Sequence, residues 1–95
     1  MRTASKPLTR LFRALSNEKR LMIVKAIAIG GEETNNTLSD KLNLPYPTVA
    51  RHLKILESSG VLTSREYGAT QFYSLKLHDH KVVQAILDNT VSILK

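Results

Sequence analysis

Two basic side chains, Arg51 and Lys54, lie three residues apart in a segment whose apolar residues recur at helical spacing. On a period of 3.6 residues they share one face of a helix, opposite its apolar face. A guanidinium has forked donors that match the O6 and N7 acceptors of guanine, whereas an ammonium pairs with phosphate as a point charge. The pattern therefore predicts a helix in the major groove of double-stranded DNA, with Arg51 on a base and Lys54 on phosphate. The alternative is an ordinary solvated basic face.

The helix that carries this basic face is expected to make most of the DNA contacts. Thr48 lies near its first turn, where free backbone N–H groups bind phosphate. His52 lies between the basic and the apolar face, so packing in the core and a phosphate contact both remain open. The candidate contacts on this helix are Tyr46, Pro47, Thr48, Ala50, Arg51, His52 and Lys54. The opposite face, expected to point into the core, consists of Val49, Leu53 and Leu56.

A helix-turn-helix of residues 37–59 is predicted to position these side chains. Thr37 and Asp40 have the spacing of a capping box, which predicts that the first helix of this motif runs from Leu38 to Leu42. Residues 43–45 form the turn between the two helices.

Three residues mark the start and the end of the second helix of the motif. Pro47 suits its first turn, where a missing N–H costs nothing. Because the residue before a proline avoids helical geometry, Tyr46 is expected in an N-cap-like position. Gly60 ends the helix.

A β-hairpin, the wing of a winged helix, is expected at residues 61–77. Val61 to Glu66 and Gln71 to Leu77 are rich in β-forming residues and flank a turn that contains Gly68. Candidate contacts to the minor groove or to the DNA backbone are Arg65, Tyr67, Thr70 and Gln71. Tyr67 is equally suited to shielding the hairpin.

Three further helices flank this unit and bring the expected total to five. An amphipathic helix begins near Pro7, and a nearly apolar second helix, capped by Ser16 and ended by Gly30–Gly31, is expected at the centre of the domain. Residues 32–36 form a polar loop. The last helix, residues 79–95, has an apolar face that needs a partner surface. The predicted dimer interface consists of Leu8, Leu11, Phe12, Leu15, Val83, Ile86, Leu87, Thr90, Val91 and Leu94.

The composition favours one small domain, residues 1–95, that binds a polyanion. A chain of 95 residues buries a modest fraction of its surface, so dimerisation is plausible. Its 14 Lys and Arg against 8 Asp and Glu give a net charge of +6. The lack of cysteine excludes disulfides, thiolate metal sites and cysteine nucleophiles. No stretch approaches the roughly 20 apolar residues of a membrane span, so we expect a soluble protein of the cytoplasm, with no membrane partner.

The order of these motifs resembles the ArsR-type winged-helix repressors. The resemblance covers roughly residues 8–94 and is carried by ALSNEKRL at 14–21, TVARHLKIL at 48–56, GVL at 60–62 and FYSL at 72–75. It implies a homodimer that pairs through its first and last helices.

Two departures from that family bear on metal sensing. Metal-sensing members carry paired cysteines in the third helix, whereas Thr34 to Lys41 has none here. A second sensing site of that family uses an Asp and a His near the start of the last helix and further His or acidic ligands about three turns later. His78, Asp79 and His80 supply only the first half of it, and Asp88 alone is a poor complement. We therefore expect no metal and no other cofactor.

The sequence as a whole predicts a mainly α fold with a small hairpin, dimeric through its first and last helices. The predicted function is that of a homodimeric repressor whose two recognition helices enter major grooves about 34 Å apart. No nucleophile and base have a spacing that supports catalysis, so the chain is not expected to be an enzyme. The alternative function is a winged helix that serves as a protein–protein or assembly module.

Overall fold

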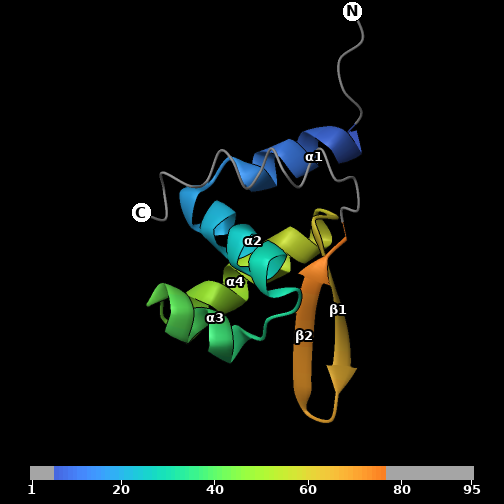
Figure 1. Cartoon of the computed structure of the whole chain (residues 1–95). Helices are drawn as coiled ribbons and strands as arrows, with labels where there is room; N and C mark the ends of the chain where they lie inside the picture. Colours follow the sequence, from blue (N-terminus) through green and yellow to red (C-terminus); the bar gives the residue numbers. More distant parts are fainter. Residues whose placement is uncertain (1–5, 77–95) are drawn as a thin grey trace, which may run out of the picture.

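The computed structural model describes residues 6–76, which form four helices followed by a two-stranded hairpin (Figure 1). In chain order the elements are α1 (Lys6–Leu15), α2 (Glu18–Gly30), α3 (Asn35–Leu42), α4 (Tyr46–Ser58), β1 (Leu62–Tyr67) and β2 (Thr70–Leu75). The prediction of a mainly helical fold with a hairpin is confirmed. The predicted fifth helix, residues 79–95, lies outside the described residues.

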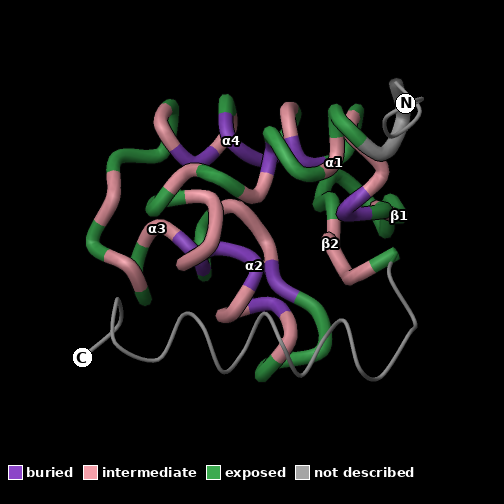
Figure 2. Tube along the Cα trace, turned by 90° about the horizontal axis from the view of Figure 1, so that it is seen from above, coloured by how far each residue is buried: buried purple, intermediate pink, exposed green. Residues whose placement is uncertain are grey.

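The core is formed around α2, which lies between α1, α3 and α4 (Figure 1). Its residues Ile23, Val24 and Ile27 are fully buried. In Figure 2 the buried stretches of α2 and α4 lie close to one another. The predicted inward face of α4 is confirmed, since its members are at most 1% exposed: Val49, Leu53 and Leu56. This apolar packing fixes which face of α4 remains at the surface.

The N-cap of the helix α2 lies one residue later than predicted. Asn17, with an extended backbone, caps the helix by accepting a hydrogen bond from the backbone N–H of Arg20 at 3.0 Å. Ser16 was predicted to be the cap, but its hydroxyl instead donates to the carbonyl of Arg13 at 2.7 Å, at the end of α1. The end of α2 is as predicted, since Gly31 follows it with a φ of 87°.

The helix α3 begins three residues earlier than predicted. Its cap is Thr34, which has an extended backbone and forms a capping box with Thr37. Thr37 was predicted to be the cap itself, with Asp40 as the reciprocal partner. Both threonines have a suitable side chain, and the cap at Thr34 is stabilised by the reciprocal hydrogen bonds between Thr34 and Thr37.

The turn between α3 and α4 also corrects one prediction. Asn43 ends α3 in the left-handed region, with a φ of 54°. Pro45 is the N-cap of α4, and Tyr46, predicted to lie outside the helix, is its first residue. The fixed φ of Pro45, −59°, and its extended ψ lead the chain into the helix one residue early. Pro47 then costs nothing, since the first N–H groups of a helix have no partner within it.

The hairpin joins two antiparallel strands through a turn of two residues, Gly68 and Ala69. Gly68 has a φ of 63°, the positive value that the first position of a type II′ turn requires. Tyr67 and Thr70, predicted to lie in the turn, pair with one another across the strands. The predicted polar loop at residues 32–36 adds an isolated β-bridge to the hairpin, since Glu33 exchanges two backbone hydrogen bonds with Tyr73, at 2.8 and 3.0 Å.

Candidate nucleic-acid interface

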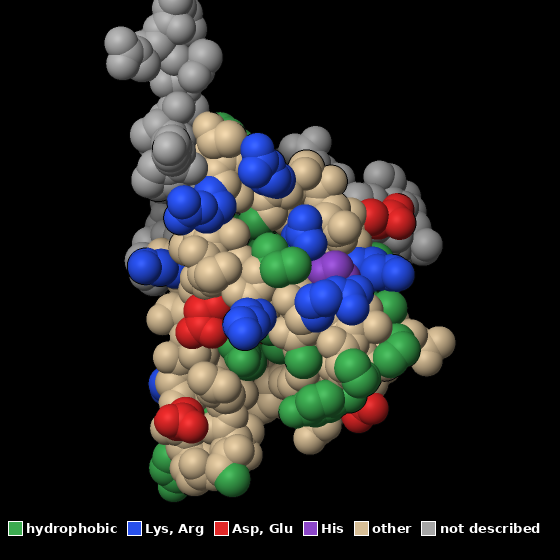
Figure 3. Space-filling model, turned by 180° about the vertical axis from the view of Figure 1, so that it is seen from behind, with side chains coloured by type: hydrophobic (Ala, Val, Ile, Leu, Met, Phe, Trp, Pro, Cys, Tyr) green, Lys and Arg blue, Asp and Glu red, His purple; other side chains and the backbone are tan. Residues whose placement is uncertain are grey.

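The outer face of α4 carries the basic side chains that the sequence singles out. In Figure 1, α4 passes behind α2, so the view from behind in Figure 3 shows this outer face. Lys and Arg side chains gather there around a histidine (Figure 3). Arg51, Lys54 and Pro47 are exposed, and the side chains opposite them are buried in the core. Tyr46 is also exposed, at 54%, so the first turn of α4 presents an aromatic ring to solvent.

The remaining predicted residues of α4 are less accessible. Thr48 and Ala50 are half-buried. His52 is 5% exposed, and its Nδ1 lies 3.4 Å from a terminal guanidinium nitrogen of Arg20. Burial lowers the pKa of His52, and the positive charges of Arg20, Arg51 and Lys19 lower it further. Of the two roles left open for His52, its position favours packing of a neutral ring rather than contact with a ligand.

Arg20 joins three helices behind the basic face. Its Nε donates to the carbonyl of Ala14 in α1 at 2.7 Å, while its guanidinium approaches His52 of α4. Since Arg20 itself belongs to α2, one side chain connects α1, α2 and α4. Sequence reasoning missed this role, because the partners lie 6 and 32 residues away from Arg20.

The hairpin presents all four of its predicted contacts to solvent. Tyr67 is 74% exposed, and Arg65, Thr70 and Gln71 are exposed as well. Arg65 differs from the other three because its guanidinium donates two hydrogen bonds to the carboxylate of Glu32, at 2.9 and 3.0 Å. The guanidinium carbon also lies 4.8 Å from the centre of the Phe72 ring.

The ion pair of Arg65 has a direct electrostatic consequence. The hydrogen bond from Arg65 lowers the pKa of the Glu32 carboxyl, and the same bond raises the pKa of Arg65. Both groups are therefore charged across the physiological range. Arg65 can reach a DNA phosphate only by leaving Glu32 or by sharing its donors.

A hollow of about 340 Å³ lies between the first turns of α3 and α4 and the tip of the hairpin. Its walls are mostly polar and bring predicted contacts from α4 together with predicted contacts from the hairpin. The lining residues are Thr34, Asn35, Asn36, Tyr46, Ala50, Ala69, Thr70, Gln71 and Tyr73. The sequence does not point to Asn35 or Asn36, because its pattern predicts a polar loop at residues 32–36.

Glu33 holds the hairpin beside α3 and was also missed. Its side chain is 5% exposed, forms an ion pair with Lys41 and accepts a hydrogen bond from the hydroxyl of Thr37 at 2.7 Å. Burial alone would raise the pKa of Glu33, but the hydrogen bonds from Lys41 and Thr37 and the charge of Lys41 outweigh it and lower the pKa. The Glu33 side chain thus contacts α3 while its backbone pairs with β2.

The predicted dimer surface is described only in part. Phe12 of α1 is 59% exposed, whereas Leu11 and Leu15 are half-buried against the core. The side chain of Leu8 and the C-terminal residues of the prediction lie outside the described part of the chain, namely Val83, Ile86, Leu87, Thr90, Val91 and Leu94.

Two other sets of residues bear on metals and membranes. Between residues 6 and 76, no group of three His, Cys, Asp or Glu side chains could hold a metal ion. His78, Asp79, His80 and Asp88 are outside that range, so the expectation about metal sensing remains a prediction. None of the four described helices is long and apolar enough to span a membrane.

Comparison with known proteins places this geometry in a family. The sequence profile of the bacterial regulatory proteins of the arsR family matches residues 17–64, which include α2, the helix-turn-helix and the start of β1. The chain is 36% identical over 63 residues to MJ1325 of Methanocaldococcus jannaschii, an uncharacterized HTH-type transcriptional regulator, covering 66% of this chain and 71% of that protein. It is also 36% identical over 78 residues to the HTH-type transcriptional repressor SmtB of Mycobacterium tuberculosis, covering 82% of this chain and 56% of SmtB.

Solved structures agree with the sequence relatives. The structure of HlyU from Vibrio cholerae superimposes with a TM-score of 0.80 at 27% identity, and the match covers 97% of this chain and 99% of HlyU. The winged-helix arrangement, the exposed basic face of α4 and the profile match therefore agree. The chain belongs to the arsR family of bacterial regulatory proteins and is a DNA-binding transcriptional regulator.

Proposed function

We propose that α4 is the recognition helix of a homodimeric repressor that binds an inverted-repeat operator. The observation that carries the proposal is the exposure of Arg51 and Lys54 on a helix whose opposite face is buried in the core. A helix held so firmly presents its basic side chains at a fixed angle, as base recognition requires. Arg51 reads a guanine through its forked donors, and Lys54 pairs with phosphate.

The hairpin serves as the wing, next to the groove that α4 enters. The polar hollow between α4 and the hairpin tip is open and lined by hydroxyl and amide groups, which suits a neutral hydrogen-bonded contact to the sugar-phosphate backbone. Tyr67, Thr70 and Gln71 then contact the backbone or the minor groove beside it.

Dimerisation uses α1 together with the C-terminal residues 79–95. Phe12 supports this arrangement, since a largely exposed aromatic ring on the first helix loses its contact with water when a second copy covers it. Two recognition helices related by a twofold axis then enter major grooves about 34 Å apart.

Repression follows when a dimer occupies promoter DNA and excludes the polymerase. SmtB is named a repressor, whereas HlyU is named a transcriptional activator, so both outputs occur among the relatives. We favour repression because it needs only occupancy of the DNA. Since its ligand is the chromosome, the protein acts in the cytoplasm.

Selection of bound genomic fragments followed by footprinting tests the proposal. Arg51→Ala should cost about 1–3 kcal/mol on the selected site and weaken the preference at one base pair. Arg51→Lys is the matched control, because it keeps the charge and loses the forked donors. Lys54→Ala should weaken binding to all sequences and flatten the salt slope by about one unit.

Two results would contradict the proposal. Unchanged affinity and preference in Arg51→Ala would show that α4 does not read the site. A lack of salt-sensitive duplex binding by the wild type would favour the alternative function, a winged helix that binds another protein.

A further inference from the structure

We propose that a second basic surface, formed by Arg10, Arg13 and Lys19, binds backbone phosphates beside the major groove that α4 enters. We call it the α1–α2 basic surface. The inference rests on the proposed function and extends it, because it assigns a DNA-binding role to helices outside the helix-turn-helix and the wing.

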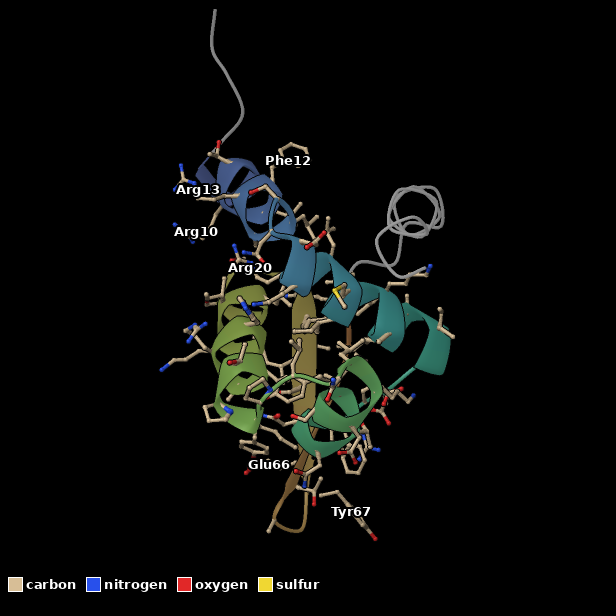
Figure 4. All side chains as sticks on the ribbon, turned by 90° about the vertical axis from the view of Figure 1, so that its left-hand side faces the viewer. Arg10, Phe12, Arg13, Arg20, Glu66 and Tyr67 are labelled. Carbon is tan, nitrogen blue, oxygen red and sulfur yellow. The ribbon has the colours of Figure 1, made fainter. Side chains whose placement is uncertain are left out.

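The orientation of α1 is the first observation. Arg10 and Arg13 are exposed and lie three residues apart, so they share one face of the helix. Figure 4 shows both pointing to the side of the molecule on which α4 lies, with Arg20 between α1 and α4. Phe12 points to another side of α1 (Figure 4), so a partner that covers Phe12 leaves the two arginines accessible.

Electrostatic continuity with α4 is the second observation. Lys19 and Arg51 both lower the pKa of His52, so both charges lie within reach of the same buried ring. Lys19 is exposed, at the start of α2. The α1–α2 basic surface is therefore joined to the basic face of α4 through Lys19 and Arg51.

The rigidity of this junction is the third observation. Arg20 donates to the carbonyl of Ala14 and contacts His52, so the positions of α1, α2 and α4 are mutually fixed. Helices held at fixed spacing lose little backbone freedom when their charges meet an equally regular row of phosphates. Within residues 6–76, the ion pairs are Lys41 with Glu33 and Arg65 with Glu32, so no described carboxylate pairs with the surface.

The surface lies at the far end of α4 from the tip of the wing. Tyr46 and Ala50 line the hollow next to the hairpin tip, whereas His52, further along α4, meets Arg20 beside the end of α1. DNA in contact with α4 is thus flanked by the wing on one side and by the α1–α2 basic surface on the other. In a dimer that pairs through α1, the surface faces the centre of the operator.

The test combines charge removal on the protein with charge removal on the DNA. The triple variant Arg10→Ala, Arg13→Ala, Lys19→Ala should bind the footprinted duplex more weakly. Its salt slope should flatten by about 0.9 for each phosphate that the variant no longer neutralises, or up to about 2.7 for each bound protomer. When the salt concentration rises from about 50 to 200 mM, the triple variant should then lose about 40-fold less affinity than the wild type for each protomer that binds.

Methylphosphonate substitution of operator phosphates locates the phosphates that this surface binds. Neutral linkages at the operator centre should weaken the wild type and leave the triple variant unaffected. Neutral linkages on the wing side should weaken both proteins equally.

Lys19→Ala tests a single charge of this surface, and Lys25→Ala is its matched control. Lys25 belongs to the same helix, about a third of a turn away from Lys19, and does not act on the pKa of His52. Lys19→Ala should flatten the salt slope and Lys25→Ala should not. If the two variants flattened the salt slope equally, the change would reflect net charge alone, and the inference would be overturned.

The two proposals fail in different ways. If the wild type binds its operator and the triple variant retains its affinity and salt slope, the inference is wrong and the proposed function stands. If the wild type binds no duplex, the proposed function fails and the inference fails with it. Because the three side chains are exposed or at the start of a helix, thermal unfolding should confirm that the variants fold.

Discussion

Gly30→Ala should destabilise this protein although alanine is the better helix former. Gly30 is the last residue of α2, and a Cβ at this position would overlap the carboxylate of Glu33, so the Glu33 side chain must shift. Glu33 is 5% exposed and holds the hairpin beside α3 through Lys41 and Thr37. The added methyl group therefore displaces a buried charged group from its partners.

The change in the free energy of unfolding caused by Gly30→Ala is a balance of two effects. Alanine is favoured over glycine within a helix by about 0.5–1 kcal/mol. Against this, a hydrogen bond to a charged group contributes about 1.5–3 kcal/mol. Because the Lys41 side chain is 55% exposed and water compensates its loss, we take about 2 kcal/mol for the contacts of Glu33 together. The free energy of unfolding should then fall by about 1–1.5 kcal/mol.

A double-mutant cycle measured by urea denaturation tests this balance. In a Glu33→Ala background the obstacle is gone, so Gly30→Ala should stabilise by about 0.5–1 kcal/mol. The coupling energy between the two positions should be about 2 kcal/mol. The reasoning is refuted if Gly30→Ala changes the free energy of unfolding equally in both backgrounds.

Three other parts of the structure give measurable expectations. Folding lowers the pKa of His52 below 6.5, so the free energy of unfolding of the protein should fall as the pH drops below 6.5 toward the folded pKa. His52→Gln should remove this part of the pH dependence in urea titrations. An unchanged pH profile in His52→Gln would contradict the role of His52. Glu32→Gln should release Arg65 for DNA and raise the DNA affinity, measured by fluorescence anisotropy, about two- to fivefold. This gain should exceed any gain from the control Glu66→Gln. An equal gain in an Arg65→Ala background would show that Arg65 is not the residue released. Phe12→Asp should dissociate the dimer in sedimentation, and a dimer that persists would exclude Phe12 from the interface.

The helices and their inward faces could be predicted because both follow from local spacing. The apolar period places Val49, Leu53 and Leu56 on one side of α4, and burial in the core leaves Arg51 and Lys54 outside. The glycines that end α2 and shape the hairpin turn could be predicted for the same reason, since a positive φ favours glycine wherever it occurs.

The starts of helices were harder to predict because neighbouring residues compete for the same role. Ser16 and Asn17 both have a side chain suited to capping, and so do Thr34 and Thr37. The choice between them depends on where the preceding segment ends. Ser16 still bonds to a carbonyl of α1, a partner that the capping pattern does not reveal.

The long-range side-chain contacts of the site could not be predicted, because their partners lie far apart in the sequence. Arg65 and Glu32 are 33 residues apart and meet only when the hairpin folds against the segment before α3. Arg20 and His52 are 32 residues apart and meet only when α2 packs on α4. Helical and strand periodicity describe one element at a time, so neither contact has a signal in the sequence.

Eight of the described basic side chains consequently fall into two functional groups. Arg65 and Lys41 are paired with carboxylates, and Arg20 connects three helices, so these cations mainly maintain the fold. The exposed cations of α4 and of the α1–α2 basic surface have no such partner among the described residues and lie on one side of the molecule. The net charge of +6 includes Glu32 and Glu33, which pair with Arg65 and Lys41 and not with these exposed cations, so it differs from the local charge of the DNA-facing side. It is this local charge that should determine how steeply DNA affinity falls with salt.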